Sequence, residues 1–226
     1  MSVELGRLDS LRVRASFRVR TSTLDIRSRT GELVARLRKE GAVRDRIAYD
    51  LLTGADPGTP AGRITASGAL DVDGSPLGIV NLTAGSVPDD EVHPLKGGPI
   101  ALVAANPASW GVVQPGLPRL SGRPRGLATR LVFNRFTRAL GNFGFDTWIA
   151  DYVLPMRFTY SGRDCAGFTI TRHRGRARFT LVIHDPRVDR RVALAALVAL
   201  IQFVLVSPGT DAVTLLRLFR RRRRPR

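Results

Sequence analysis

The chain has 226 residues, 43% of them hydrophobic, and its 36 basic against 19 acidic residues give a formal net charge of +17. This apolar content is ample for a core and excludes global disorder, and the length fits one large domain or two small ones. The positive charge favours an anionic partner, such as lipid headgroups, nucleic acid or an acidic protein.

Arginine supplies all of the basic residues except Lys39 and Lys96. A guanidinium group can bind a phosphate through two parallel hydrogen bonds, although codon bias in a GC-rich bacterial genome also produces an arginine excess. Cys165 is the only cysteine, so the chain cannot form an internal disulfide. A reducing cytosol is then its natural compartment. Residues 1–20 contain no apolar stretch of a secretory signal peptide, which also predicts a cytoplasmic protein.

Strict alternation marks the first predicted strand, residues 11–20. Apolar side chains fall on one side and the arginines Arg12, Arg14, Arg18 and Arg20 on the other, which is the pattern of a strand with one buried face. These arginines form either a solvated face that discourages pairing at a sheet edge or part of a surface that binds nucleic acid.

Short apolar segments joined by glycine-containing turns follow the first strand. Their spacing of eight to twelve residues is typical of an all-β sandwich or barrel. We predict strands at residues 24–27, 33–37, 46–51, 63–66, 70–72, 77–82, 100–105, 110–114, 147–160, 165–172 and 178–184, and an irregular basic loop at residues 115–125.

Residues 126–142 change to the three- and four-residue apolar spacing of a surface helix. This segment combines Arg130, Arg135 and Arg138 with two phenylalanines, and such a basic amphipathic helix can lie on an anionic membrane surface. The alternative is a helix that caps one mouth of a barrel with its arginines in solvent.

Residues 192–206 are apolar at every position except Gln202. We predict a helix over residues 186–206, with Asp185 as its N-cap and Pro186 at its first position. A helix that is apolar on all faces must be enclosed by protein or by lipid. The apolar stretch spans about 22 Å, shorter than a bilayer core of about 30 Å, which favours protein. The expected core side chains are those of Val192, Leu194, Leu197, Leu200, Ile201, Phe203 and Val204.

This order of elements resembles the superfamily that joins the tubby C-terminal domain, the plant LURP-one-related proteins and the phospholipid scramblases. The resemblance is carried by the hairpin at residues 71–79, the strand at Trp110 and, above all, residues 179–194. That last segment is similar to the strand, Pro-x-x-Asp step and basic residue that introduce the scramblase helix. The resemblance implies a closed antiparallel β-barrel of about twelve strands that encloses the C-terminal α-helix, with one surface helix in addition.

The resemblance also implies that the chain is divided into three parts. Residues 1–10 would be an N-terminal extension, residues 11–206 the barrel with its central helix at 186–206, and residues 207–226 a basic C-terminal tail.

The chain departs from the scramblases in ways that affect function. It has neither their proline-rich N-terminal region nor their cysteine cluster. The aspartates before the helix, Asp185 and Asp189, alternate with Arg187, Arg190 and Arg191, and these arginines would repel a calcium ion. We therefore do not expect calcium-dependent lipid scrambling.

The sequence contains no catalytic motif. His93, His173 and His184 have no serine or cysteine partner at a recognisable spacing. Residues 71–74 begin like a calcium loop, but the remaining ligands are missing, so a hairpin turn is the better interpretation. We predict a protein that is not an enzyme and that needs no cofactor or metal.

The leading hypothesis is a lipid-associating barrel, cytoplasmic and peripheral to the inner face of a membrane, which binds anionic phospholipid or phosphoinositide headgroups. One alternative is a nucleic-acid-binding basic protein, and the other is a tail-anchored protein with residues 192–206 in the bilayer. The predicted headgroup-binding residues are Arg123, Arg125, Arg130, Arg135, Arg138, Arg217, Arg220, Arg221, Arg222, Arg223 and Arg224.

Overall fold

The computed structural model describes residues 3–18, 20–41, 47–54, 58–81, 110–126, 129, 155–173 and 177–203. Within these ranges the chain forms twelve strands between two helices. The helices are α1 (Val3–Arg7) and α6 (Arg190–Phe203), and the strands are β1 (Ser10–Phe17), β2 (Thr21–Arg27), β3 (Leu33–Glu40), β4 (Tyr49–Thr53), β5 (Thr59–Thr65), β6 (Gly68–Leu70), β7 (Pro76–Asn81), β8 (Gly111–Val113), β9 (Leu120–Arg125), β10 (Met156–Gly162), β11 (Cys165–Arg172) and β12 (Arg178–Ile183).

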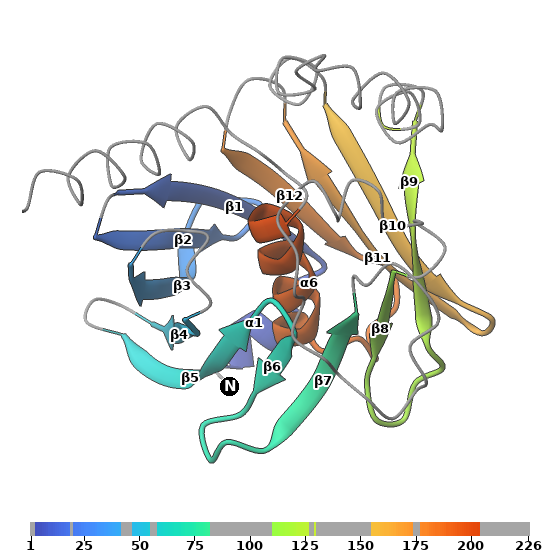
Figure 1. The fold of residues 1–226 in the computed structure, drawn as a ribbon, viewed down its shortest axis with the longest axis horizontal. Helices are drawn as coiled ribbons and strands as arrows, with labels where there is room; N and C mark the ends of the chain where they lie inside the picture. The colour runs from blue at the N-terminus through green and yellow to red at the C-terminus, as the bar shows by residue number, and fades with distance from the viewer. Residues whose placement is uncertain are drawn as a thin grey trace, which may run out of the picture.

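The strands form one closed antiparallel barrel, in which each strand pairs with its neighbours in the chain (Figure 1). The barrel closes where β1 pairs with β12, with Leu11 opposite Leu181 and Val13 opposite Phe179. All four of these side chains are buried, so the closing pair of strands contributes to the core. The predicted fold class, a closed barrel around a C-terminal helix, is confirmed.

Alternation along β1 places its side chains as the sequence predicts. Leu11, Val13 and Ala15 are buried, whereas Arg12 and Arg14 are exposed on the outer wall. The observed strand ends at Phe17 rather than at Arg20.

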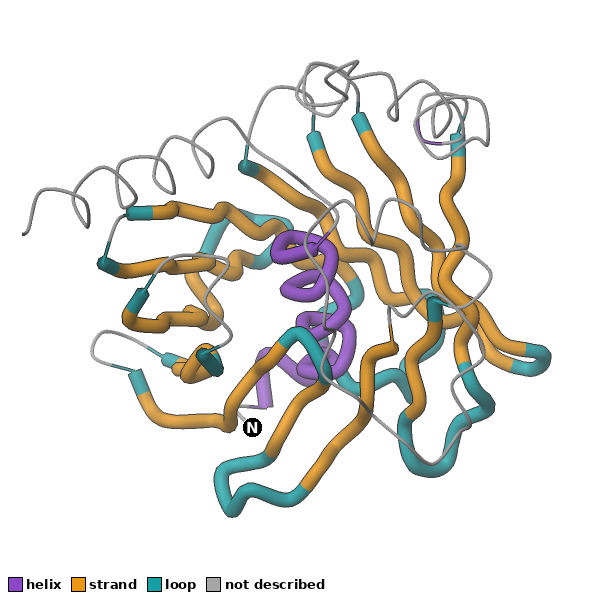
Figure 2. The backbone as a smooth tube through the Cα atoms, in the orientation of Figure 1, coloured by secondary structure: helices purple, strands orange, loops and turns teal. Residues whose placement is uncertain are grey.

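Helix α6 lies inside the barrel, where Figure 2 shows it surrounded by strands. Each residue from Val192 to Leu200 is at most 1% exposed, and the helix packs mainly on β5, β6 and β7. On β7, a Cβ atom added to Gly78 would fall 2.8 Å from a methyl group of Val192, so this strand approaches the helix at a glycine. Ile201 is also buried, whereas the side chain of Phe203 and all of Val204 lie outside the described residues. None of the described helices is long and apolar enough to cross a membrane.

The start of α6 differs from the prediction. The helix begins at Arg190, because Asp189 is its N-cap: the Asp189 side chain accepts the backbone N–H of Arg191 at 2.8 Å, and its carbonyl accepts the N–H of Ala193 at 3.1 Å. Asp185 instead accepts the backbone N–H of Arg187 at 3.0 Å and closes the turn before the helix.

The prediction of an irregular loop over residues 115–125 is wrong in its second half, where β9 pairs with β8 and β10. Leu120 and Gly122 point inward on this strand, while Arg123 and Arg125 point outward. A Cβ atom on Gly122 would lie 2.7 Å from the Tyr160 ring. The alternation is hidden in the sequence because a glycine occupies an inward position against an aromatic ring.

Several predicted segments fall outside the described residues. These are the strand at 100–105, nearly all of the helix at 126–142, the first part of the strand at 147–160, and the C-terminal tail. Near the N-terminus, α1 places the fully buried Leu5 in the same core as the barrel strands.

Gly167 on β11 has a backbone conformation that only glycine tolerates here. Its φ is +63°, a Cβ atom would overlap the carbonyl oxygen of Tyr160, and its own carbonyl accepts the N–H groups of His184 and Asp185 at 2.8 and 3.1 Å. We expect Gly167→Ala to lower the free energy of unfolding by at least about 2 kcal/mol, as measured in urea. Gly74→Ala is the control, because that turn glycine has φ +86° with nothing within 4 Å of its added Cβ. It should cost only about 1 kcal/mol, and equal losses would contradict the steric explanation.

Candidate functional site

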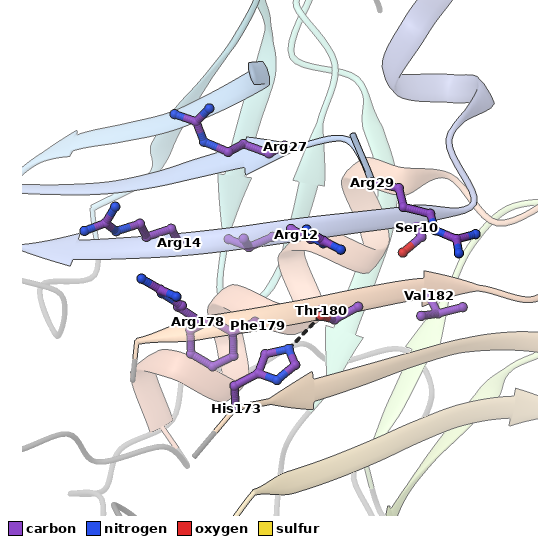
Figure 3. Close-up of a pocket in the computed structure, with 11 residues that line it drawn as sticks. Ser10, Arg12, Arg14, Arg27, Arg29, His173, Arg178, Phe179, Thr180 and Val182 are labelled. Atoms are coloured by element: carbon purple, nitrogen blue, oxygen red, sulfur yellow. Dashed lines mark hydrogen bonds between the residues drawn. The ribbon is translucent and has the colours of Figure 1, made fainter. Parts of the chain in front are cut away.

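A basic pocket of about 920 Å³ lies on the outer wall of the barrel, over β2, β1 and β12. Figure 3 shows its lining residues, which come from both ends of the chain. We call this site the arginine pocket, and its charged members are Arg12, Arg14, Arg27, Arg29 and Arg178.

Strand register brings four of these five arginines together in facing pairs. Arg12 on β1 lies directly opposite Arg27 on β2, and Arg14 lies directly opposite Arg178 on β12. Directly opposite residues have Cβ atoms about 5 Å apart, and like charges at such positions destabilise a sheet. Two repulsive pairs therefore stand side by side on one face.

An aspartate beside these pairs is hydrogen-bonded to an arginine outside the pocket. Asp25 lies opposite Arg14, but its carboxylate accepts a hydrogen bond of 2.8 Å from Arg36 Nε instead. Arg27 donates to the carbonyl of Gly31 at 2.9 Å. Among the described residues, no carboxylate forms an ion pair with the arginines of the pocket.

A histidine and a hydroxyl group complete the arginine pocket. His173 Nε2 and Thr180 Oγ1 are 2.7 Å apart, and Thr180 lies opposite Arg12 in the register of β1 and β12. Guanidinium, hydroxyl and imidazole groups all bind phosphate oxygens, so the arrangement suits a phosphate-bearing ligand.

The sequence predictions cover part of this site. Arg12 and Arg14 were predicted on an exposed strand face, as they are found, but Arg18 and Arg20 lie beyond the end of β1. Arg123 and Arg125 lie exposed on the outer face of β9. The other predicted headgroup-binding arginines, at positions 130, 135, 138, 217 and 220–224, lie outside the described residues.

The predicted site residues do not include Arg27, Arg29, Arg178 or His173, which all line the arginine pocket. The local pattern places Arg178 at the start of a strand of alternating character. It gives no sign that this strand pairs with β1, since the two segments are far apart in the chain.

At the start of α6, aspartates and arginines form ion pairs. Arg191 donates to Asp71 and to Asp189, in each case at 2.9 Å. Arg187 donates to both oxygens of Asp185, and these hydrogen bonds hold the pKa of that carboxyl well below its usual range.

The neighbouring Cys165 is buried, which raises the pKa of its thiol, and Asp185 raises it further. In the part of the chain that the structure describes, no group of three or more His, Cys, Asp or Glu side chains could hold a metal ion.

Comparison of the chain with protein-family models, with curated proteins and with solved structures found no match in any of the three. The closed twelve-stranded barrel with its C-terminal helix is consistent with a tubby-like fold.

Proposed function

We propose that this protein is a non-enzymatic barrel of the tubby, LURP-one-related and scramblase superfamily that binds anionic phospholipid headgroups at the cytosolic face of a membrane. The arginine pocket is the proposed contact with the headgroup phosphate. The observation that carries this proposal is the two facing arginine pairs, Arg12 with Arg27 and Arg14 with Arg178.

Two features of the pairs support an anionic ligand. A pair of like charges directly opposite each other costs the folded protein roughly 0.2–1 kcal/mol, so an anion bound between them relieves a repulsion that exists without it. Each guanidinium group can also donate two parallel hydrogen bonds to a phosphate.

The chemistry of the pocket favours lipid phosphate over nucleic acid. Proteins that bind single-stranded nucleic acid add aromatic rings on which the bases stack. Phe179 is the aromatic residue among those lining the described pocket, and its side chain is buried in the barrel core. The exposed ring in the lining is the imidazole of His173, which lies 2.7 Å from Thr180 Oγ1, so the pocket offers mainly charge and hydroxyl groups.

The arginines of residues 126–142 and 217–224 that we predict to bind headgroups are part of the same proposal. Basic residues near an anionic bilayer each contribute about 1 kcal/mol, so they would add to the affinity of the pocket.

The test is flotation with vesicles of phosphatidylcholine, with and without phosphatidylglycerol. We expect the wild-type protein to float only with the anionic vesicles. The variant Arg12→Thr/Arg178→Thr removes one arginine from each pair and should lose more than about tenfold in vesicle affinity. Its free energy of unfolding should rise by about 0.2–1 kcal/mol per pair, because the repulsion is gone.

The matched control is Arg38→Thr/Arg63→Thr, which removes the same net charge from the outer wall on β3 and β5, where Asp50 lies opposite both arginines. It should float almost as the wild-type protein does. Equal losses in the two variants would show that total charge, not the pocket, drives binding. Retention of an oligonucleotide but not of anionic vesicles would overturn the lipid proposal in favour of nucleic acid.

A further inference from the structure

We infer that the barrel wall carries a second anion subsite beside the arginine pocket, so that the protein binds two headgroup phosphates of one anionic bilayer at the same time. This inference rests on the proposed function. We call the second site the β9–β12 subsite.

The β9–β12 subsite is a pocket of about 690 Å³ lined by Arg125, Arg157, Thr159, Thr169, Thr171 and His184, among others. Arg157 on β10 lies directly opposite Arg125 on β9, which makes a third facing pair of arginines. No described carboxylate forms an ion pair with either of them. A bound anion would relieve the repulsion within this pair, as it would in the first two pairs.

The two sites repeat the same chemistry. In the β9–β12 subsite, His184 Nε2 and Thr169 Oγ1 are 2.9 Å apart, and Thr169 Oγ1 lies 3.3 Å from Thr159 Oγ1. In the arginine pocket, the matching contact joins His173 and Thr180. Each site therefore combines facing arginines with a histidine hydrogen-bonded to a threonine hydroxyl.

The register shows how the sites are spaced along the wall. One row of directly opposite residues crosses six strands, in the order Arg27, Arg12, Thr180, Thr171, Arg157 and Arg125. Two threonines separate the arginine pairs, so the backbones at Arg12 and Arg157 lie three strand spacings, about 14 Å, apart. A phosphate held between the two arginines of one pair leaves the other pair free for a second phosphate.

The sites also adjoin each other, since Val182 lines both pockets. Two weak contacts to one surface act together, because the second forms at the high effective concentration that the first creates. Vesicle binding should then rise steeply with the fraction of anionic lipid.

The experiment measures vesicle binding while the phosphatidylglycerol content of phosphatidylcholine vesicles is raised in steps. The wild-type protein should show an apparent order of about two in anionic lipid. Arg125→Thr/Arg157→Thr should lower this order to about one and weaken binding at least about tenfold, and so should Arg12→Thr/Arg178→Thr. Arg38→Thr/Arg63→Thr should keep the wild-type order. Circular dichroism melting should show all three variants folded.

The outcomes separate this inference from the proposed function. If Arg125→Thr/Arg157→Thr binds as the wild-type protein does while Arg12→Thr/Arg178→Thr loses binding, the second subsite is wrong and the arginine pocket stands. If neither variant loses binding, both proposals fail. Inorganic phosphate is the second probe: saturable binding of it without any vesicle binding would overturn the assignment to a bilayer.

Discussion

Leu200→Asp is expected to unfold the whole barrel. Leu200 is fully buried in α6, the helix that fills the barrel interior. An unpaired carboxylate at this fully buried position should cost several kcal/mol. A domain of this kind is stable by only about 5–15 kcal/mol. Urea unfolding followed by circular dichroism, together with size-exclusion chromatography, would measure the loss.

Two control variants isolate the effect of burial at Leu200. Val72→Asp makes the same type of change at a side chain in the turn between β6 and β7 that is 63% exposed, and it should change stability by less than about 0.5 kcal/mol. Leu200→Met keeps the volume and should cost less than about 1.5 kcal/mol. A Leu200→Asp protein that folds normally but no longer associates with membranes would instead support the alternative in which residues 192–206 enter the bilayer.

Arg191→Met should give the second largest loss of stability. The Arg191 side chain is 8% exposed, and it joins the N-cap residue Asp189 to Asp71 in the turn after β6, with N···O distances of 2.9 Å in both pairs. Removing the cation leaves two carboxylates without their partner while an apolar side chain keeps the volume. We expect a loss of about 3 kcal/mol, the lower end for a broken buried pair, because Asp71 is 36% exposed and can be hydrated.

Arg63→Met is the matched control for this change. Arg63 pairs with Asp50 at 3.5 Å on the outer wall, where both side chains are about two-thirds exposed. Exposed pairs contribute about 0–1 kcal/mol, so this variant should unfold at almost the wild-type urea concentration. Similar losses in the free energy of unfolding at the two positions would mean that the ion pairs of Arg191 do not stabilise the packing of the helix in the barrel.

Much of the fold can be predicted from local patterns. The alternation at Ser10–Phe17 predicts a strand and its buried face. The apolar run at residues 192–206 predicts a helix that must be enclosed by protein or lipid. The start of that helix could not be predicted, since Asp185 and Asp189 are both good caps and only the hydrogen bonds of the preceding turn select the second. Strand β9 was missed because Gly122 occupies its inward position.

The candidate site was harder to predict than the fold. Alternation shows that Arg12 and Arg14 face outward, but a facing pair depends on register, and register is a tertiary property. Arg14 meets Arg178 only when the barrel closes, and Arg125 meets Arg157 only when β9 and β10 pair in the observed register. Arginines that look scattered in the sequence thus become three facing pairs on one wall.

The closure between β1 and β12 also determines when this protein can fold during synthesis. Strand β1 is the first of the described strands to be made, yet its partner β12 and the helix that fills the interior follow all of the other described strands. Until then the nascent chain exposes an unpaired strand edge and an apolar inner surface, both of which promote aggregation. Contacts this distant in sequence also make folding slow. The growing polypeptide therefore exposes these aggregation-prone surfaces for longer than a sheet in which every pairing joins consecutive strands.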